Sequence, residues 1–282
     1  MNFDVYAYNE ARQSLLKDDC RKILKLEENV TNKLSKSLLD VASDIKKDFD
    51  TASQLKPYWE KYAPFQRGHK PRGEAFPWGE VGEKVIEGYV YSLAPRIFDN
   101  VRFVGVPYGH DIRFLSGDSF VHIDTKSTGP TDNAEEVVSS PNQVTGTGKL
   151  EQNCVVYNDM VEMRGKRVRR DFQPELAPFY IIDDRILPTL TFYIKVVYSV
   201  KILGNQPLEY LEIICVPNGL ILFDGPKLIN KIQGLFTPGK DEVKVVRKRT
   251  RIKLKPLSQL DSWRCQKIKF DRAKPYIEFR SN

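Results

Sequence analysis

The sequence predicts a mixed α/β fold of the α+β type, in which N-terminal helices precede a strand-rich remainder. Apolar residues at Leu34, Leu38, Val41 and Ile45 follow helical spacing and form one stripe. Every second residue over 191–201 is instead apolar, which is typical of a strand. A chain of 282 residues with 41% hydrophobic residues can bury a sizeable core, so this order of elements favours one mixed fold.

The first third of the chain is expected to be mainly helical. Residues 9–52 are predicted as helices, and their apolar stripe fits a scaffold or a dimer contact. Four prolines and three glycines make residues 56–79 irregular. This stretch is either an arm that crosses a nucleic acid backbone or a packed surface loop. A further helix is predicted over 80–93.

A β-hairpin is expected next. Residues 111–115 and 120–126 are two apolar-rich runs, and the turn-forming residues 116–119 separate them. Successive side chains of a strand point to opposite faces, so Val121 and Ile123 share a side that suits a core.

The later part of the chain alternates polar loops with strands. Turn-forming residues dominate 127–132 and 140–148, and such loops can hydrogen-bond sugar, phosphate or base edges. Further strands are predicted over 210–216 and 220–223.

The composition excludes several classes of protein. No apolar run approaches the about 20 residues of a membrane-spanning helix, and no signal peptide is visible at the N-terminus. Cys20, Cys154, Cys215 and Cys265 are far apart, which argues against a zinc site or a disulfide framework. We therefore expect a cytoplasmic protein with no membrane partner.

The candidate catalytic residues are Asp111, Asp124 and Lys126, because the hairpin brings Asp111 beside Asp124 on the strand face that also carries Lys126. Two carboxylates at about 4 Å repel by roughly 4 kcal/mol at an effective dielectric of about 20. Mg²⁺ bound to Asp111 and Asp124 removes this repulsion, and waters and phosphate complete its shell. Such an ion polarises a scissile phosphate and acidifies water, while Lys126 stabilises the added negative charge. An ordinary surface ion pair between Asp124 and Lys126 is the alternative.

Other titratable residues lie near these three in the sequence. Glu80, Glu83 and Glu87 occupy one side of the helix expected over 80–93, where one of them is a candidate auxiliary metal ligand. As a group they are typical of a solvated face. His110 and His122 flank the carboxylates and are expected to be hydrogen-bonding or strand residues.

The positive charge of the chain is concentrated near its C-terminal end. The net charge is +7, and residues 240–274 alone contain thirteen Lys and Arg residues against four Asp and Glu. Within this stretch every odd position over 247–255 is basic, namely Arg247, Arg249, Arg251, Lys253 and Lys255. In a strand these side chains share one face, where like charges repel unless an anion lies opposite. This pattern favours double-stranded DNA as the partner, and a solvated edge strand protected by charge is the alternative.

The segment 236–242 is expected to be a turn that leads into this basic strand. It presents Lys240, Asp241 and Glu242, and a mixture of donors and acceptors suits base edges better than phosphates. Arg can bond guanine through two N–H groups, whereas Lys mostly contacts phosphate. The candidate DNA-binding residues are therefore Lys240, Asp241, Glu242, Arg249, Arg251, Lys253 and Lys255.

Taken together, these segments resemble the type II restriction endonucleases of the PD-(D/E)xK superfamily. The active-site pattern alone is common, but the ordered set of segments covers most of the chain. The resemblance is carried by residues 56–59, 77–84, Asp111, 124–130, 140–144, 216–220, 238–241 and 249–251.

The resemblance implies a restriction-endonuclease core with a central mixed β-sheet flanked by helices. It implies a homodimeric, Mg²⁺-dependent endodeoxyribonuclease that cuts duplex DNA at an interrupted palindrome and leaves 5′-phosphate ends. By similarity Asp111 and Asp124 hold the metal, Lys126 is catalytic, and Lys240, Glu242, Arg249 and Arg251 match base-reading positions. The segment between Asp111 and Asp124 is shorter than in the family, and Glu242 stands where Asp is expected. The recognised bases or their spacing therefore differ.

Residues 1–282 are expected to form one endonuclease domain. Its sections are a helical part at 1–55, a catalytic core at about 78–200 and a DNA-reading β part at about 205–282. A restriction enzyme also implies a cognate DNA methyltransferase as a functional partner. Two rival functions remain open: a structure-selective repair or recombination nuclease, and a sequence-specific DNA-binding protein without catalysis.

Overall fold

A computed structural model describes most of the chain. The described residues are 4–59, 75–105, 109–151, 154–156, 161–164, 169–199, 207–239 and 249–280. The α-helices are α1 (Val5–Leu16), α2 (Arg21–Asp40), α3 (Ala42–Trp59), α4 (Ala75–Ile97) and α5 (Leu254–Leu260). No helix in these ranges is long and apolar enough to cross a membrane.

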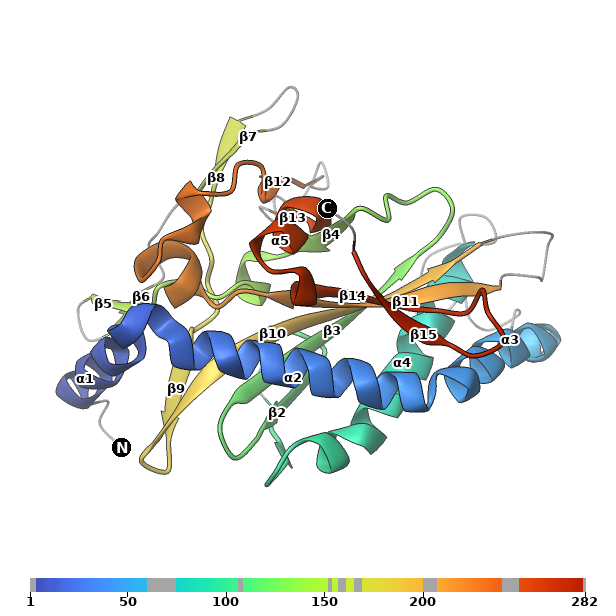
Figure 1. Cartoon of the computed structure of the whole chain (residues 1–282), viewed down its shortest axis with the longest axis horizontal. Helices are drawn as coiled ribbons and strands as arrows, with labels where there is room; N and C mark the ends of the chain where they lie inside the picture. Colours follow the sequence, from blue (N-terminus) through green and yellow to red (C-terminus); the bar gives the residue numbers. More distant parts are fainter. Residues whose placement is uncertain are drawn as a thin grey trace.

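The centre of the fold is a mixed sheet (Figure 1). Its strands are β1 (Arg102–Phe103), β2 (Ile112–Leu115), β3 (Phe120–Thr128), β9 (Phe179–Ile182), β10 (Arg185–Tyr198), β11 (Leu208–Val216), β14 (Cys265–Lys269) and β15 (Tyr276–Phe279). They lie in the order β1-β2-β3-β10-β11-β14-β15, and β9 pairs with β10. β3 and β10 run parallel, while β2 and β11 are antiparallel to these neighbours. The expected central mixed sheet flanked by helices is confirmed.

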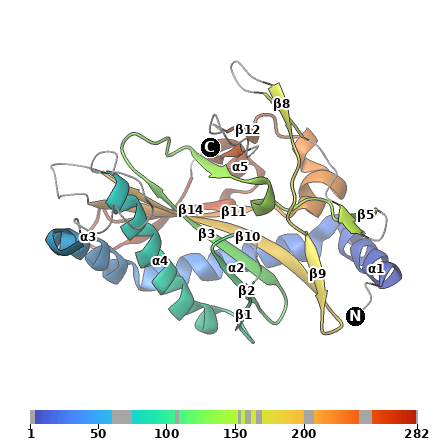
Figure 2. The ribbon, with the colours of Figure 1, turned by 180° about the vertical axis from the view of Figure 1, so that it is seen from behind.

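One face of this sheet packs against α2, α3 and α4 (Figure 1). Val121 and Ile123 of β3 and Phe192 of β10 are fully buried in this layer, as their alternation predicts. Seen from behind, α4 crosses the sheet beside β2 and β3 (Figure 2).

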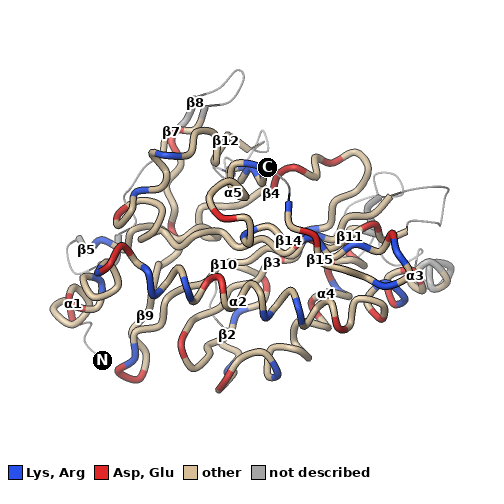
Figure 3. Tube along the Cα trace, in the orientation of Figure 1, with Lys and Arg blue, Asp and Glu red and all other residues tan. Residues whose placement is uncertain are grey.

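The helical stripe in the N-terminal section is also confirmed. Leu34 and Leu38 of α2 and Ile45 of α3 are buried in the core, and Val41 packs against it between the two helices. Lys and Arg are interspersed with Asp and Glu along the trace of these helices (Figure 3), and exposed residues of both signs occur among them. This surface therefore carries mixed charge rather than one sign.

The opposite face of the sheet carries a small three-stranded sheet and α5. The small sheet has the order β12-β13-β4, with β12 (Phe236–Pro238), β13 (Thr250–Lys253) and β4 (Glu136–Ser139). Two short hairpins lie nearby, formed by β5 (Lys149–Glu151), β6 (Cys154–Val156), β7 (Val161–Arg164) and β8 (Arg169–Phe172). Short turns of other helical type are η1 (Lys17–Cys20), η3 (Pro141–Gln143), η4 (Leu220–Asp224), η5 (Leu228–Asn230) and η6 (Ser262–Arg264).

The irregular stretch expected over 56–79 is shorter than predicted. α3 continues to Trp59 and α4 begins at Ala75, so both ends of the stretch are helical. Pro77 lies in the first turn of α4, where the missing N–H of proline leaves no helical hydrogen bond unmade. Residues 60–74 lie outside the described ranges.

The strand expected over 220–223 is wrong, because η4 is a π-helical turn. The side chain of Asn218 accepts a hydrogen bond from the N–H of Leu220 at 2.9 Å and so starts the turn. Gly219 lies so close to the backbone that a Cβ atom would stand 2.0 Å from the carbonyl oxygen of Gly146. A short apolar run does not reveal by periodicity whether it is a strand or a helical segment.

The basic strand expected over 247–255 is also shorter than predicted. β13 covers only Thr250–Lys253, and Lys255 lies on α5 with an exposed side chain. Leu254 and Leu257 are buried at helical spacing. Pro256 suits the first turn of a helix but would remove a hydrogen bond from a strand ladder. The first residues of the turn expected over 236–242 form a strand instead, namely β12.

Candidate active site and DNA interface

The β2–β3 hairpin brings the two predicted acidic residues together. Ile112 lies opposite Ile123 in the antiparallel register, which places Asp111 beside Asp124. The two carboxyl groups are close enough to share a hydrogen bond. Asp124 is buried, with 1% of its side chain exposed, whereas Asp111 is exposed at the end of the strand.

This environment makes Asp124 an unusual acid. Burial raises the pKa of Asp124 to about 7, the neighbouring Asp111 adds to this rise, and Lys126 opposes it. A proton shared by two carboxylates relieves part of their repulsion, and a divalent cation would balance both charges. The donor set of two carboxylates therefore fits a hard divalent cation.

Lys126 and Gln143 hold Asp124 from two sides. The ammonium group of Lys126 forms an ion pair with Oδ2 of Asp124, and 32% of the lysine side chain is exposed. Gln143 donates from Nε2 to Oδ1 of Asp124 at 3.2 Å. The Oε1 atom of Gln143 accepts a hydrogen bond from the N–H of Ser140 at 3.1 Å, which completes a capping box on η3.

One of the three candidate glutamates of α4 also reaches this site. Glu83 accepts a hydrogen bond from the N–H of Ser127, and the charges of Lys126 and Asp111 act on it. Burial raises the pKa of Glu83, and Lys126 counteracts the rise. Glu87 instead forms an ion pair with Lys84 at 2.7 Å. Glu83 is therefore a glutamate of α4 that lies near Lys126.

Close packing of α4 on β3 places Glu83 there. A Cβ atom on Gly82 would stand 2.8 Å from Oγ of Ser127 and 3.0 Å from Cγ1 of Val196. The hydroxyl of Ser127 donates to the carbonyl oxygen of Gly79 at 2.5 Å. Only a residue without a side chain lets the helix approach the strand this closely.

A metal at this site needs ligands beyond the two carboxylates of Asp111 and Asp124. Within the described ranges no group of three or more His, Cys, Asp and Glu side chains is arranged to hold an ion. Asp111 and Asp124 supply two carboxylates. Waters and a phosphate group suit the remaining positions, since Mg²⁺ usually keeps several waters and binds through one or two carboxylates.

His110 and His122 pack behind the carboxylates. Both rings are buried, and neither forms a hydrogen bond within the described part of the chain. Burial lowers the pKa of His122 to about 3, and the pKa of His110 also falls well below its usual value. The ring of His110 lies 5.1 Å from that of Tyr193, so both histidines pack as neutral aromatic residues.

Some of the predicted DNA-binding residues lie within the described part of the chain and others lie outside it. Lys240, Asp241 and Glu242 lie outside the described ranges, between β12 and β13. Gly239 donates from its N–H to the carbonyl oxygen of Arg249 at 2.8 Å, so these two residues close the described end of the hairpin. Arg251 and Lys253 lie on one face of β13, and both form ion pairs with Glu136 of β4.

The small sheet that carries β13 is hydrogen-bonded to the central sheet beside Asp124 and Lys126. Tyr193 of β10 is in register with Asp124, and its hydroxyl bonds that of Ser139 at 2.5 Å. Lys195 of β10 is in register with Lys126, and its ammonium donates to the carbonyl oxygen of Glu136 at 3.0 Å. The two ends of β4 are therefore held by Tyr193 and Lys195, the register neighbours of Asp124 and Lys126.

Sequence reasoning did not single out Glu136, Gln143, Tyr193 or Lys195. The pattern Ser140-x-x-Gln143 is a capping-box signal that could have identified Gln143. No comparable local signal marks Glu136, because β4 has only four residues and pairs with a strand far away in the sequence.

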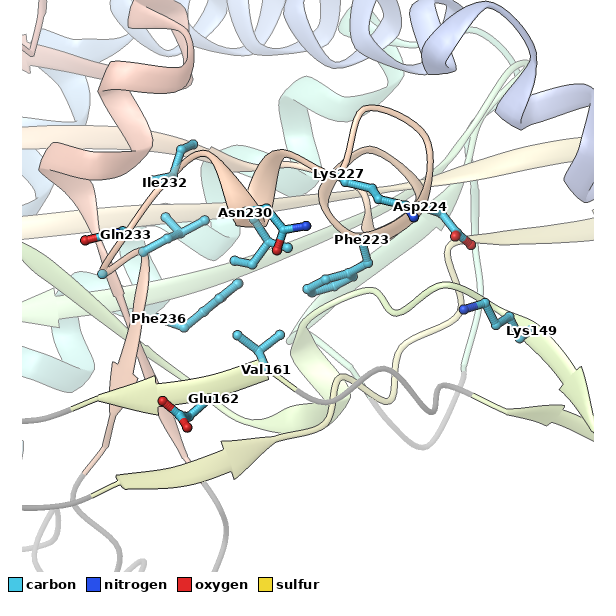
Figure 4. A pocket seen from close by; sticks show the side chains of 13 residues that line it. Lys149, Val161, Glu162, Phe223, Asp224, Lys227, Asn230, Ile232, Gln233 and Phe236 are labelled. Atoms are coloured by element: carbon cyan, nitrogen blue, oxygen red, sulfur yellow. The ribbon is translucent and has the colours of Figure 1, made fainter.

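A separate hollow of about 640 Å³ lies between β7 and the segment that follows η4 (Figure 4). Its charged lining residues have both signs, namely Lys149, Glu162, Asp224 and Lys227. Its lining includes none of the candidate catalytic or DNA-binding residues, so we do not assign the catalytic chemistry to it.

This chain is similar in sequence to known proteins. Residues 3–268 match the family model described as restriction endonuclease BglI. The chain is 32% identical over 278 residues to the type II restriction enzyme BglI of Bacillus subtilis, covering 90% of this chain and 93% of that protein.

Two solved structures resemble the fold. The crystal structure of BglI bound to its DNA recognition sequence matches with a TM-score of 0.83 and 30% identity, covering 95% of this chain and 97% of that chain. The tetrameric restriction endonuclease SfiI bound to cognate DNA matches with a TM-score of 0.63 and 14% identity, covering 90% and 88%. The likeness to SfiI concerns the fold alone.

Proposed function

Because this chain belongs to the BglI family of type II restriction endonucleases, we propose that Asp111, Asp124 and Lys126 form the site at which it cuts DNA. The chain is a site-specific endodeoxyribonuclease. The observation that supports the assignment is that the buried carboxyl group of Asp124 lies beside that of Asp111, with the pKa of Asp124 raised to about 7 and a lysine in contact. A repair nuclease would need the same three residues, but the family favours the restriction enzyme.

The divalent ion we propose is Mg²⁺, held by Asp111 and Asp124. When bound, it would polarise the scissile phosphate and acidify a water molecule. Lys126 is half-buried and contacts Asp124, so its ammonium lies where it can stabilise the charge that develops on the phosphate. Gln143 keeps Asp124 in one orientation. Glu83, beside Lys126, orients the lysine.

The proposed reaction is hydrolysis of one phosphodiester bond in each strand. Water attacks phosphorus in line with the bond to the 3′ oxygen, which leaves, and the products are 5′-phosphate and 3′-hydroxyl ends. Lys126, which contacts Asp124, would lie beside a non-bridging oxygen of a phosphate bound at this site. The proton of the attacking water leaves to solvent or to a neighbouring phosphate group.

Recognition is proposed to occur at an interrupted palindrome. Lys240, Glu242, Arg249 and Arg251 are the proposed base readers, with Asp241 beside them. Lys253 and Lys255 are proposed as phosphate contacts, because Lys is the less specific donor. The exposed position of Lys255 on α5 supports a backbone contact.

A two-fold dimer is the proposed assembly, since a palindrome presents two equal half-sites. Analytical ultracentrifugation of the protein alone and with a palindromic duplex tests this. Two protomers per duplex and cleavage of both strands are expected. Monomers in both samples, together with nicking of single strands, would refute the dimer. A cognate DNA methyltransferase is the proposed functional partner, because the host's own sites need protection.

The catalytic assignment is tested by separating binding from cleavage. Asp124→Asn and Lys126→Ala should lose cleavage in Mg²⁺ while cognate duplex binding in Ca²⁺ stays close to wild type. A DNA-binding protein without catalysis would bind in the same way but cut nothing even as wild type. Cleavage by Lys126→Ala at nearly the wild-type rate would show that the site is elsewhere.

A further inference from the structure

A single buried carboxylate holds two cations of the proposed recognition strand. Oε1 of Glu136 forms an ion pair with Arg251, and Oε2 forms one with Lys253. Only 4% of the Glu136 side chain is exposed, whereas 31% of each cationic side chain is exposed. The carboxylate of Glu136 is therefore enclosed, whereas the side chains of Arg251 and Lys253 reach the solvent.

The register of the small sheet explains this arrangement. Lys253 lies directly opposite Glu136 in the antiparallel β4–β13 pair, and Arg251 lies opposite Val138. Residues two apart on a strand share a face, so Arg251 reaches Glu136 diagonally. One negative charge thus stands between two positive charges, and the cluster keeps a net positive charge toward the solvent.

The backbone of Glu136 is fixed as well as its carboxylate. Lys195 is buried beneath it and donates to the carbonyl oxygens of Ala134 at 2.7 Å and Glu136 at 3.0 Å. At the other end of β4, the hydroxyl of Ser139 bonds that of Tyr193. A carboxylate on an anchored strand is a rigid partner for a flexible arginine.

This geometry has two consequences for a DNA-reading arginine. Glu136 engages Nη1 of Arg251 and leaves the other N–H groups of the guanidinium for a base edge. Holding the guanidinium in one orientation before binding removes part of the ordering cost of binding. The same negative charge also weakens attraction to any phosphate backbone, whatever its sequence.

We propose that Glu136 is a specificity-determining positioning residue, which orients Arg251 for base reading and weakens binding to non-cognate DNA. The proposal rests on the proposed function, because it requires that Arg251 reads a base. The proposal predicts that a substitution of Glu136 weakens binding to cognate DNA and strengthens binding to non-cognate DNA. Loss of a merely structural residue would instead weaken binding to both.

The test is Glu136→Gln, which keeps the shape of the side chain and removes its charge. Binding to cognate and scrambled duplexes is measured in Ca²⁺ across a salt series. Cognate affinity should fall by about 5- to 10-fold, which is part of the discrimination that a bidentate arginine–guanine contact provides. Non-cognate affinity should rise by a few-fold, with a salt slope steeper by about one unit.

Glu135→Gln is the matched control. Glu135 is the preceding residue, is 60% exposed and pairs with Arg280 rather than with β13. Its substitution removes the same charge, so affinity for both duplexes should change together and their ratio should stay constant. An unchanged ratio in Glu136→Gln as well would overturn the proposal.

A double variant shows whether Glu136 acts through Arg251. In the Arg251→Ala background, Glu136→Gln should cause no further loss of cognate affinity; a full additional loss would contradict the proposal. If Glu136→Gln is poorly folded by circular dichroism, Glu136→Asp keeps the charge but shortens its reach to Arg251. Cognate affinity should then fall while non-cognate affinity stays near wild type, and an equal loss on both duplexes would overturn the proposal. If Arg251→Ala alone weakens both duplexes equally, the base-reading function itself has failed.

Discussion

Lys126 and Lys195 are neighbours in register on the parallel strands β3 and β10. The first contacts Asp124 in the catalytic site, and the second is buried and anchors the start of β4. β4 pairs with β13, which carries Arg251. The proposed catalytic lysine and the residue that anchors β4, the partner of the proposed recognition strand, are therefore neighbours in one sheet.

Replacing Lys195 by Met should change how stability depends on pH. Burial lowers the pKa of Lys195 from 10.5 to about 8. The unfolded chain therefore binds more protons than the folded one between these values, and stability should rise with pH across this window. The full rise is about 3 kcal/mol at 1.36 kcal/mol per unit.

Urea denaturation of both proteins between pH 7.5 and pH 10.5 measures this effect. Tyrosines with raised pKa values, such as Tyr198 and Tyr210, are present in both proteins, so the difference between the two curves isolates Lys195. Parallel curves would show that Lys195 remains protonated in the folded protein across this range.

Gly82→Ala should damage both stability and cleavage. The new Cβ atom would stand 2.8 Å from Oγ of Ser127, which pushes α4 away from β3 and moves Glu83 from Lys126. We expect a loss of roughly 1–3 kcal/mol in the free energy of unfolding, together with slower single-turnover cleavage. Gly88→Ala is the control on the same helix.

No atom lies within 4 Å of the Cβ position at Gly88. Gly88→Ala should therefore stabilise the protein by about 0.5–1 kcal/mol and leave cleavage unchanged. If both variants behave alike, the close approach of α4 to β3 is not what positions the site.

Gln143→Ala should slow the chemical step while leaving DNA binding intact. Gln143 donates to Asp124 at 3.2 Å, and its loss leaves one carboxylate oxygen without that bond. We expect about a 10-fold slower single-turnover rate, which corresponds to about 1.4 kcal/mol. Cognate affinity in Ca²⁺ should stay within about two-fold of wild type. A loss confined to affinity would place Gln143 in DNA binding instead.

Arg251→Ala and Lys255→Ala should differ in whether they weaken binding to cognate DNA alone or to all DNA. Loss of a guanine contact by Arg251 should weaken cognate binding by roughly 1–3 kcal/mol and non-cognate binding much less. Loss of a phosphate contact by Lys255 should weaken both equally and reduce the salt slope by about one unit. Binding of each variant to cognate and scrambled duplexes over a salt series separates the two roles. Equal loss on both duplexes for Arg251→Ala would reduce β13 to an electrostatic contact.

The parts that the sequence could predict are those set by local pattern. The hairpin of Asp111 and Asp124 follows from alternation and a short turn, and the structure places the two carboxyls together. Glu83 could not be distinguished from Glu80 and Glu87, because its position depends on how closely α4 docks at Gly82.

The end of the basic strand and the role of Glu136 were also hard to predict, because both depend on contacts between distant parts of the chain. Alternation of charge predicted a strand as far as Lys255. The strand ends at Lys253 instead, and α5 follows, with Pro256 in its first turn and Leu257 buried. Glu136 gave no signal, since its importance arises from pairing with β13, more than a hundred residues later. The function of such residues depends on tertiary contacts rather than on local sequence.

The most direct test of the account is sequencing of cleavage ends from mixed-sequence phage DNA incubated with Mg²⁺ and either wild type or Lys126→Ala. Wild type should produce 5′-phosphate ends in both strands at one interrupted palindromic sequence, and Lys126→Ala should produce none. Ends scattered over many sequences or gathered at branched DNA, or the same ends from Lys126→Ala at nearly the wild-type rate, would contradict it.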